Sequence, residues 1–280
     1  MSNPLLSYLY KLYRANEHLE SLDQELIAFL QPDSYEIVTK FEDERDIAGE
    51  DRVRGTLRRR VIFKREPPLL VWGNIIGDVI QNLRSALDHV IFAISFSRAP
   101  SEFRDDRTTE FPICDDPNTF HRPRRRNRPP LYEIRGIPPD AQAVVEGLQP
   151  YHRGKGYLSD DPLWILREMS NIDKHRNIHV TAWSAHTISL DITDIAPRVR
   201  IHSHRVRLPG VIESGTVIAE IDITTPRLSK GAMYVEKEFY FTVAFGQGTP
   251  LVGQPANVAL GELGLYVEGI VEALGRFVVE

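Results

Sequence analysis

The chain has 280 residues, of which 42% are hydrophobic and 26% charged, so it can fold as one large domain or two ordinary ones. Its formal charge of −5 argues against a protein that coats nucleic acid by charge alone. The single cysteine excludes an intrachain disulfide and a cysteine-based zinc site. We find no signal peptide and no apolar run near the roughly 18 residues of a membrane span. We therefore expect a cytoplasmic protein without a membrane segment.

The first third of the chain predicts two helices separated by a hairpin. Leucines at helical spacing, with charges between them, predict a long amphipathic helix over residues 4–31. The alternating residues 35–41 and 55–64 predict the two strands of a hairpin. Pro67 and Pro68 then begin a very apolar helix that we expect to end near Ser97.

The rest of the chain predicts a loop, shorter helices and then strands. Residues 98–139 are rich in Pro, Arg and Asp and predict a loop, whereas helices are predicted at about 139–148 and 161–172. Apolar residues at helical spacing predict a last helix over residues 257–280. Strands are predicted by β-branched alternation at residues 178–184, 187–193, 198–206, 216–224 and 233–245.

Together these elements predict an α+β fold with an N-terminal helical bundle, an inserted β-hairpin, a C-terminal antiparallel sheet and a final amphipathic helix. We expect a helical domain over residues 1–176, with the hairpin at residues 34–65. A β region over residues 177–280 follows, closed by the helix at residues 257–280. Two alternatives stay open: the hairpin can join the C-terminal sheet, and the two regions can form a single domain.

Polar side chains are unusually dense on the second long helix, within residues 77–89. Asn82, Arg84, Asp88 and His89 lie at the borders of a broad apolar arc, where a polar group buried without a partner costs about 1–3 kcal/mol. In a structural interpretation, Arg84 and Asp88 form an i,i+4 ion pair and His89 caps a neighbouring backbone group. In a functional interpretation, these side chains form a site.

The spacing from Arg84 to His89 resembles the Arg-x4–6-His pattern of the HEPN superfamily, which includes metal-independent ribonucleases of toxin and phage-defence systems. The resemblance implies that both side chains face a dimer cleft, so a homodimer is expected by analogy. Arg84 would stabilise the charge on the scissile phosphate. His89 would transfer a proton at about pH 7, and Asp88 would orient His89.

Further motifs extend over roughly residues 75–180. They are GDxxxNLRSALDH, TEFPI at residues 109–113, LQPY at residues 148–151, and LWIL at residues 163–166 leading into NxDKHR. This series resembles a group of uncharacterised bacterial proteins. The resemblance identifies a family and implies no activity.

A second polar cluster follows the helix predicted at residues 161–172. It consists of Asn171, Asp173, Lys174, His175 and Arg176. The macrodipole and the unpaired carbonyl groups of a helix C-terminus stabilise cations, so a capping or packing role can by itself explain the last three. If this cluster faces the first one, His175 is a candidate catalytic group. Asn82, Asn171, Asp173, Lys174 and Arg176 are then candidates for binding a phosphate or supporting the catalytic groups.

Two further sequence features leave alternatives open. Asp88, His89, Asp173 and His175 could instead hold a divalent metal, but no ligand motif such as HExxH accompanies them, and we expect no metal or cofactor. The arginine block at residues 121–128 (HRPRRRNR) is either a solvated surface loop or a contact to phosphate or RNA.

The functional hypothesis that follows is an RNA- or nucleotide-binding protein of HEPN type. It is a candidate metal-independent endoribonuclease of a toxin or phage-defence system, with Arg84, Asp88, His89 and His175 as catalytic groups. The alternative is a non-catalytic protein-interaction module, in which the polar clusters lock the helices together.

Overall fold

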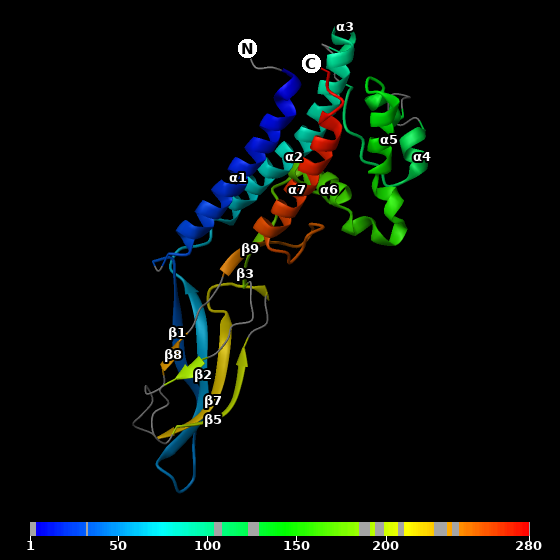
Figure 1. Ribbon diagram of the computed structural model, residues 1–280. Helices are drawn as coiled ribbons and strands as arrows, with labels where there is room; N and C mark the ends of the chain where they lie inside the picture. Colours follow the sequence, from blue (N-terminus) through cyan, green and yellow to red (C-terminus); the bar gives the residue numbers. More distant parts are fainter. Residues whose placement is uncertain are drawn as a thin grey trace. The chain divides into compact units, whose positions relative to one another are not determined.

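The computed structural model confirms the predicted α+β fold, with helices and antiparallel strands gathered in two compact units (Figure 1). The helical unit comprises Met1–Gln24, Leu70–Val180 and Phe245–Glu280, and the β unit comprises Glu25–Leu69 and Thr181–Ala244. The structure describes residues 4–31, 33–103, 108–122, 129–184, 191–193, 199–206, 210–226, 234–236 and 241–279.

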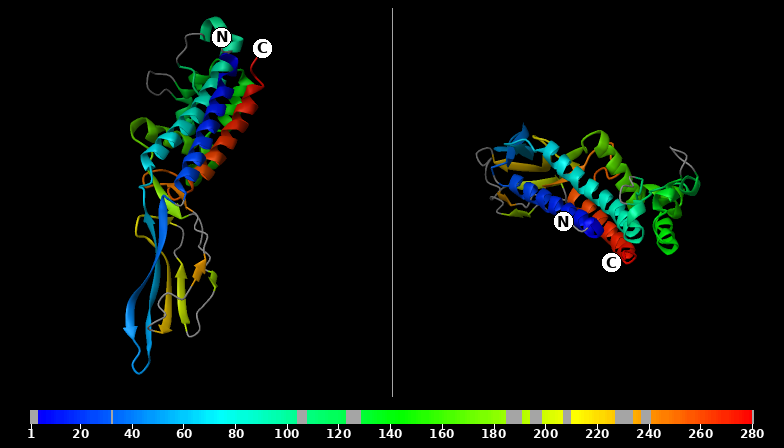
Figure 2. Two further views of the ribbon diagram at one scale, coloured as in Figure 1. Left: turned by 90° about the vertical axis from the view of Figure 1, so that its left-hand side faces the viewer. Right: turned by 90° about the horizontal axis from the view of Figure 1, so that it is seen from above.

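Three long helices form the centre of the helical unit: α1 (Ser7–Phe29), α2 (Leu69–Arg98) and α7 (Ala256–Gly275). They lie side by side in every ribbon view (Figure 1 and Figure 2). Asn257 at the start of α7 donates a hydrogen bond to Asp23 of α1 (3.4 Å), so α1 and α7 run antiparallel. All three helices fall where apolar residues at helical spacing predict them, because each buries an apolar side against the other two.

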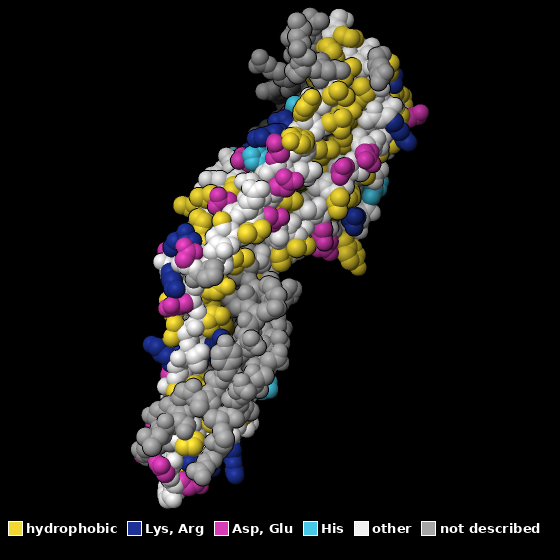
Figure 3. Space-filling view, turned by 60° about the vertical axis from the view of Figure 1, so that its left-hand side comes forward, with side chains coloured by type: hydrophobic (Ala, Val, Ile, Leu, Met, Phe, Trp, Pro, Cys, Tyr) yellow, Lys and Arg dark blue, Asp and Glu magenta, His cyan; other side chains and the backbone are white. Residues whose placement is uncertain are grey.

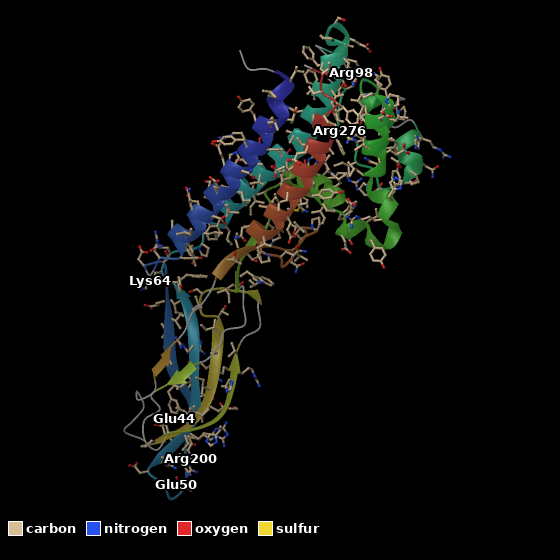
Figure 4. All side chains as sticks on the ribbon, in the orientation of Figure 1. Glu44, Glu50, Lys64, Arg98, Arg200 and Arg276 are labelled. Atoms are coloured by element: carbon tan, nitrogen blue, oxygen red, sulfur yellow. The ribbon has the colours of Figure 1, made fainter. Side chains whose placement is uncertain are left out.

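The far end of α7 returns to the end of α2. Figure 4 shows Arg98 and Arg276 at the same end of the helical unit. There the backbone N–H of Val279 donates a hydrogen bond to Oγ of Ser97 (3.1 Å). The chain therefore closes the helical unit with its last residues, and α7 belongs to this unit rather than to the β region.

Shorter helices complete the helical unit. They are α3 (Pro100–Phe103), α4 (Pro117–His121), α5 (Pro139–Gly147) and α6 (Pro162–His175), with 3₁₀ turns at Pro4–Leu6, Pro130–Ile134, Pro150–Arg153 and Lys155–Asp160. The prediction of a loop over residues 98–139 is therefore wrong in part. Each short helix there has proline in its first turn, where the fixed φ angle and missing N–H are compatible with a helix.

The β unit is built on a four-stranded antiparallel sheet with the strand order β1-β2-β7-β5. Its strands are β1 (Tyr35–Asp46), β2 (Arg52–Phe63), β5 (Arg200–Val206) and β7 (Val217–Pro226). The early hairpin, β1–β2, joins the C-terminal strands because β2 pairs with β7, with Leu57 opposite Ile221. This pairing is why the two units differ from the expected division after residue 176.

Smaller sheets account for the other described strands. One has the order β6-β3-β9 and the other pairs β4 with β8. Their bounds are β3 (Val180–Ser184), β4 (Asp191–Thr193), β6 (Gly210–Val211), β8 (Tyr234–Glu236) and β9 (Phe241–Phe245). Parts of the strands predicted at residues 187–193 and 233–245, and most of the arginine block at residues 121–128, lie outside the described residues.

The two faces of the four-stranded sheet differ in polarity, because side chains alternate along each strand. Leu57, Ile221 and Ile223 form a buried apolar cluster. Position 58 on β2, one residue on, belongs to the opposite face, where the Arg58 guanidinium bonds Glu42 and Glu220 at 2.8 Å each. This opposite face is held by cross-strand ion pairs.

Candidate functional site

The polar residues of α2 point in two directions from one helix. Successive helical residues lie about 100° apart, so Arg84 and His89, five positions apart, point about 140° away from each other. Arg84 and Asp88, four positions apart, share one side of α2 and form an ion pair, with 3.1 Å between Nη1 and Oδ1. His89 lies close enough to Lys11 of α1 for the lysine charge to lower the pKa of the imidazole. The helix therefore separates the arginine from the histidine.

The Arg84–Asp88 pair holds the backbone of Phe111. Arg84 Nη2 donates a hydrogen bond to the carbonyl oxygen of Phe111 (2.8 Å), and the Phe111 N–H donates to Oδ1 of Asp88 (2.9 Å). The side chains of Arg84 and Asp88 are only 16% and 29% exposed. The pair thus satisfies both polar backbone groups of a buried residue, and we call this arrangement the Phe111 clamp.

Two further side chains hold the residues that follow Phe111. We call residues 111–114 the FPIC segment; all four are buried. Gln149 accepts a hydrogen bond from the Cys114 N–H and donates one to the Pro112 carbonyl, both at 2.9 Å. Arg167 of α6 donates to the Ile113 carbonyl (3.2 Å). The segment is therefore anchored by side chains from α2, from α6 and from the turn at residue 149, which explains why it needs no neighbouring strand.

The sequence motifs at residues 109–113 and 148–151 find a structural explanation here. The motifs alone imply no role, and the sequence does not identify Gln149 and Arg167 as members of the polar network. A buried glutamine directly before Pro150 is a signal that could have been read, because a buried amide requires partners. Nothing in the sequence identifies those partners as backbone groups of a distant segment.

The second cluster meets the first through Asp173. Gln81 of α2 donates a hydrogen bond to Oδ2 of Asp173 (3.0 Å) and another to the Ser170 carbonyl (3.3 Å). One turn earlier on α2, a Cβ atom at Gly77 would overlap the Asp173 carboxylate. Glycine at residue 77 therefore permits the close approach of α6, and Asp173 works as a packing contact between α2 and α6.

Lys174 is the other residue of the second cluster that acts on the first. Burial raises the pKa of Asp88 above its usual range, and the negative charge of Glu110 adds a smaller effect in the same direction. The Arg84 guanidinium, the Phe111 N–H and, least of all, the charge of Lys174 lower this pKa without cancelling the effect of burial. Asp88 thus sits in an environment that disfavours its charged form despite its arginine partner.

The remaining predicted site residues lie apart from the Phe111 clamp. Asn82 donates a hydrogen bond to the Asp78 carbonyl of its own helix (2.8 Å). Asn171 and His175 are exposed on the last turns of α6, which runs past the predicted end at residue 172. Arg176, also exposed, caps this helix through its backbone N–H. The described contacts do not join His175 to Arg84, Asp88 or His89.

His89 is a half-buried side chain on the α1 side of α2. Its Nδ1 atom is buried and has no hydrogen-bond partner among the described residues. Burial lowers the pKa of His89, and the positive charge of Lys11 lowers it further. The neutral imidazole is therefore favoured, and no carboxylate among the described residues bonds the ring.

A pocket of about 160 Å³ adjoins the Phe111 clamp. Arg84 and Arg167 line it together with Glu110 and Glu133, so positive and negative side chains balance. Both guanidinium groups already bond a backbone carbonyl and a carboxylate, the partner of Arg167 being Asp115 (3.1 Å). An incoming phosphate would have to displace these bonds.

Across the part of the chain that the structure describes, no three His, Cys, Asp or Glu side chains gather as metal ligands would. No described helix combines the length and apolar character needed to cross a membrane. Comparisons with protein-family models, with curated proteins and with solved structures find no match for this chain.

Proposed function

We propose that this chain is a non-catalytic protein-binding module, in which the polar clusters of α2 and α6 fix the fold. One observation carries the proposal. Arg84 and Asp88 bond the backbone of Phe111, whereas His89 lies on the α1 side of α2. Their chemistry is thereby used for folding rather than presented to a ligand.

Phosphodiester cleavage without a metal needs a different arrangement. A cation must stabilise the negative charge of the phosphate while an acid or base within hydrogen-bond reach transfers a proton. Arg84 and His89 point about 140° apart on one helix, and His175 is exposed at the end of another. Cleavage of RNA by the purified chain would distinguish the ribonuclease hypothesis from the proposed binding role.

The surface of α1 supports a binding role. Four large apolar side chains, Leu6, Leu9, Tyr10 and Tyr13, are exposed at or near its N-terminal end, the two tyrosines by 63% and 60%. Their spacing of three, four and seven residues places them on one side of the helix. Figure 3 shows hydrophobic side chains gathered on this part of the helical unit. A contiguous apolar surface of this kind is characteristic of protein–protein contacts.

The test is cleavage of a mixed-sequence RNA by the purified chain in EDTA, alongside Arg84→Ala and His89→Ala variants. We expect no cleavage by any of the three proteins, and a lower unfolding midpoint for Arg84→Ala because its loss leaves the Phe111 carbonyl unpaired. Cleavage by the wild type that both variants lose would overturn the proposal and support the HEPN-type hypothesis. An Arg14→Ala variant, which removes an exposed ion pair to Glu17, controls for nonspecific loss of charge.

A further inference from the structure

A groove of about 250 Å³ lies between α1 and α7, above α2. Val79 and Leu83, two buried residues of α2, form the floor of the groove. Ala15 and Leu19 contribute from α1, and Leu260 contributes from α7. The groove is therefore apolar along its base and is formed by all three central helices.

Glycines keep the α7 side of the groove open. A Cβ atom at Gly261 or Gly264 would meet no other atom within 4 Å, although both residues line the groove. Leu265, beside them on α7, is 72% exposed. On the α1 side, Leu9 precedes Asn16 of the groove by seven residues and so lies on the same side of the helix. The exposed Leu9 thus lies two turns before the groove, on the same side of α1.

Acidic side chains predominate on the two helices beside the groove. Glu268 of α7 lines the groove itself, and α7 contains no lysine or arginine. Lys11 and Arg14 of α1 lie nearer the start of that helix, beside the exposed Tyr10 and Tyr13. The part of α1 after Arg14 also lacks lysine and arginine; its acidic residues are Glu17, Glu20, Asp23 and Glu25. Figure 3 shows acidic side chains spread over the helical unit around the hydrophobic ones. The groove therefore favours a partner with positive charges at its edges.

We propose that the groove between α1 and α7 binds an amphipathic helix of a partner protein, with lysine or arginine residues flanking its apolar side. The proposal rests on the proposed function, a non-catalytic binding module. Apolar side chains spaced at i, i+3 or i+4, and i+7 on that helix would enter the groove, as in other helix-in-groove complexes. A second copy of this chain fits less well, because its own α1 and α7 would bring carboxylates against carboxylates.

A display library of helical peptides tests the proposal. Its apolar positions are fixed at i, i+3, i+4 and i+7, and its flanking positions vary among Lys, Gln and Glu. Selection on the full chain should enrich lysine-flanked peptides, and the best peptide should bind at least tenfold more tightly than its glutamate-flanked counterpart in fluorescence anisotropy. Enrichment without a preference for lysine, or no enrichment at all, overturns the proposal.

Three variants locate the binding. Gly261→Leu places a side chain in the open groove and should weaken the selected peptide at least tenfold. Gly269→Leu makes the same change on the same helix, at a residue that also has open space but does not line the groove, and should leave affinity unchanged. Glu268→Lys should weaken lysine-flanked peptides. Equal binding by wild type and Gly261→Leu overturns the assignment to this groove.

Two controls separate the possible failures. Sedimentation of the wild type and of Gly261→Leu, without peptide, detects self-association. A dimer that forms in the wild type but not in Gly261→Leu would assign the groove to a second copy of this chain. It would overturn the proposal of a partner helix while leaving the non-catalytic function intact. RNA cleavage that depends on Arg84, in contrast, would overturn the proposed function whether or not the peptide binds.

Discussion

Gly77 lies so close to the Asp173 carboxylate that any Cβ atom at residue 77 would overlap it. The contact joins α2 to α6, and the same carboxylate accepts a hydrogen bond from Gln81 (3.0 Å).

Gly77→Ala should destabilise the fold by about 1–2 kcal/mol, although alanine is intrinsically better than glycine in a helix by about 1 kcal/mol. The added methyl group forces the Asp173 carboxylate away and breaks its hydrogen bond to Gln81. Denaturant unfolding measures the change. Gly264→Ala, where the methyl group meets open space, should instead stabilise by about 0.5–1 kcal/mol. If Asp173 is the cause, Gly77→Ala should cost little in an Asp173→Ala background.

Arg84→Ala should destabilise the fold by about 2–4 kcal/mol, because it leaves the Asp88 carboxylate and the Phe111 carbonyl without their partner. Urea unfolding followed by circular dichroism provides the measurement. Arg14→Ala removes an arginine whose ion pair to Glu17 is exposed, and should cost below about 1 kcal/mol. Equal losses in the two variants would argue against the Phe111 clamp.

Ionisation of Glu42 should make the stability of the β unit depend on pH in the acidic range. Hydrogen bonds from Arg60 and Arg58 lower its pKa from 4.5 to about 2. The unfolded chain therefore binds the proton first as the pH falls, so the stability that Glu42 contributes above pH 4.5 is lost as the pH falls toward about 2. Melting temperatures across this range should fall less steeply in Glu42→Gln. Glu36→Gln removes a glutamate of the same strand whose ion pair to Lys64 (3.4 Å) is exposed, and it controls for the loss of one acidic side chain.

Ionisation of His89 should change the stability of the fold at a higher pH than ionisation of Glu42. The pKa of His89 is lowered from 6.5 by burial and by Lys11, so the unfolded chain takes up the proton first as the pH falls through 6.5. The His89 contribution is complete above that pH and declines below it. Side-chain NMR titration should place the His89 pKa below 6.5, and His89→Gln should reduce the loss of stability on acidification. A His89 pKa above 6.5 would contradict the described surroundings of the ring.

Periodicity predicts the elements better than it predicts their partners. α1, α2 and α7 follow from apolar residues at helical spacing, because such a pattern is local. The pairing of β2 with β7 joins residues more than 150 positions apart, and many strands of similar composition could have competed for it. The short helices between residues 98 and 139 were missed because they are brief and begin at proline.

In the candidate site, too, the sequence predicts contacts within one helix but not contacts with distant segments. The Arg84–Asp88 ion pair follows from an i,i+4 spacing, and the structure contains it. Its main partner is the backbone of Phe111, and a backbone group carries no signature in the sequence. Gln81 was also missed, since a single glutamine on an apolar helix does not reveal that Asp173 faces it. The contacts that support a structural role for α2 are therefore ones that the sequence does not reveal.

The anchoring of the FPIC segment has a consequence for hydrogen exchange. The Phe111 and Cys114 amides donate to side chains of Asp88 and Gln149 instead of to a neighbouring strand. Their protons can exchange with solvent only when the segment separates from those side chains, so the two slow amides in an otherwise irregular stretch would report on the opening of the helical unit. Deuterium uptake at these two amides thus measures how often α2 separates from its neighbours.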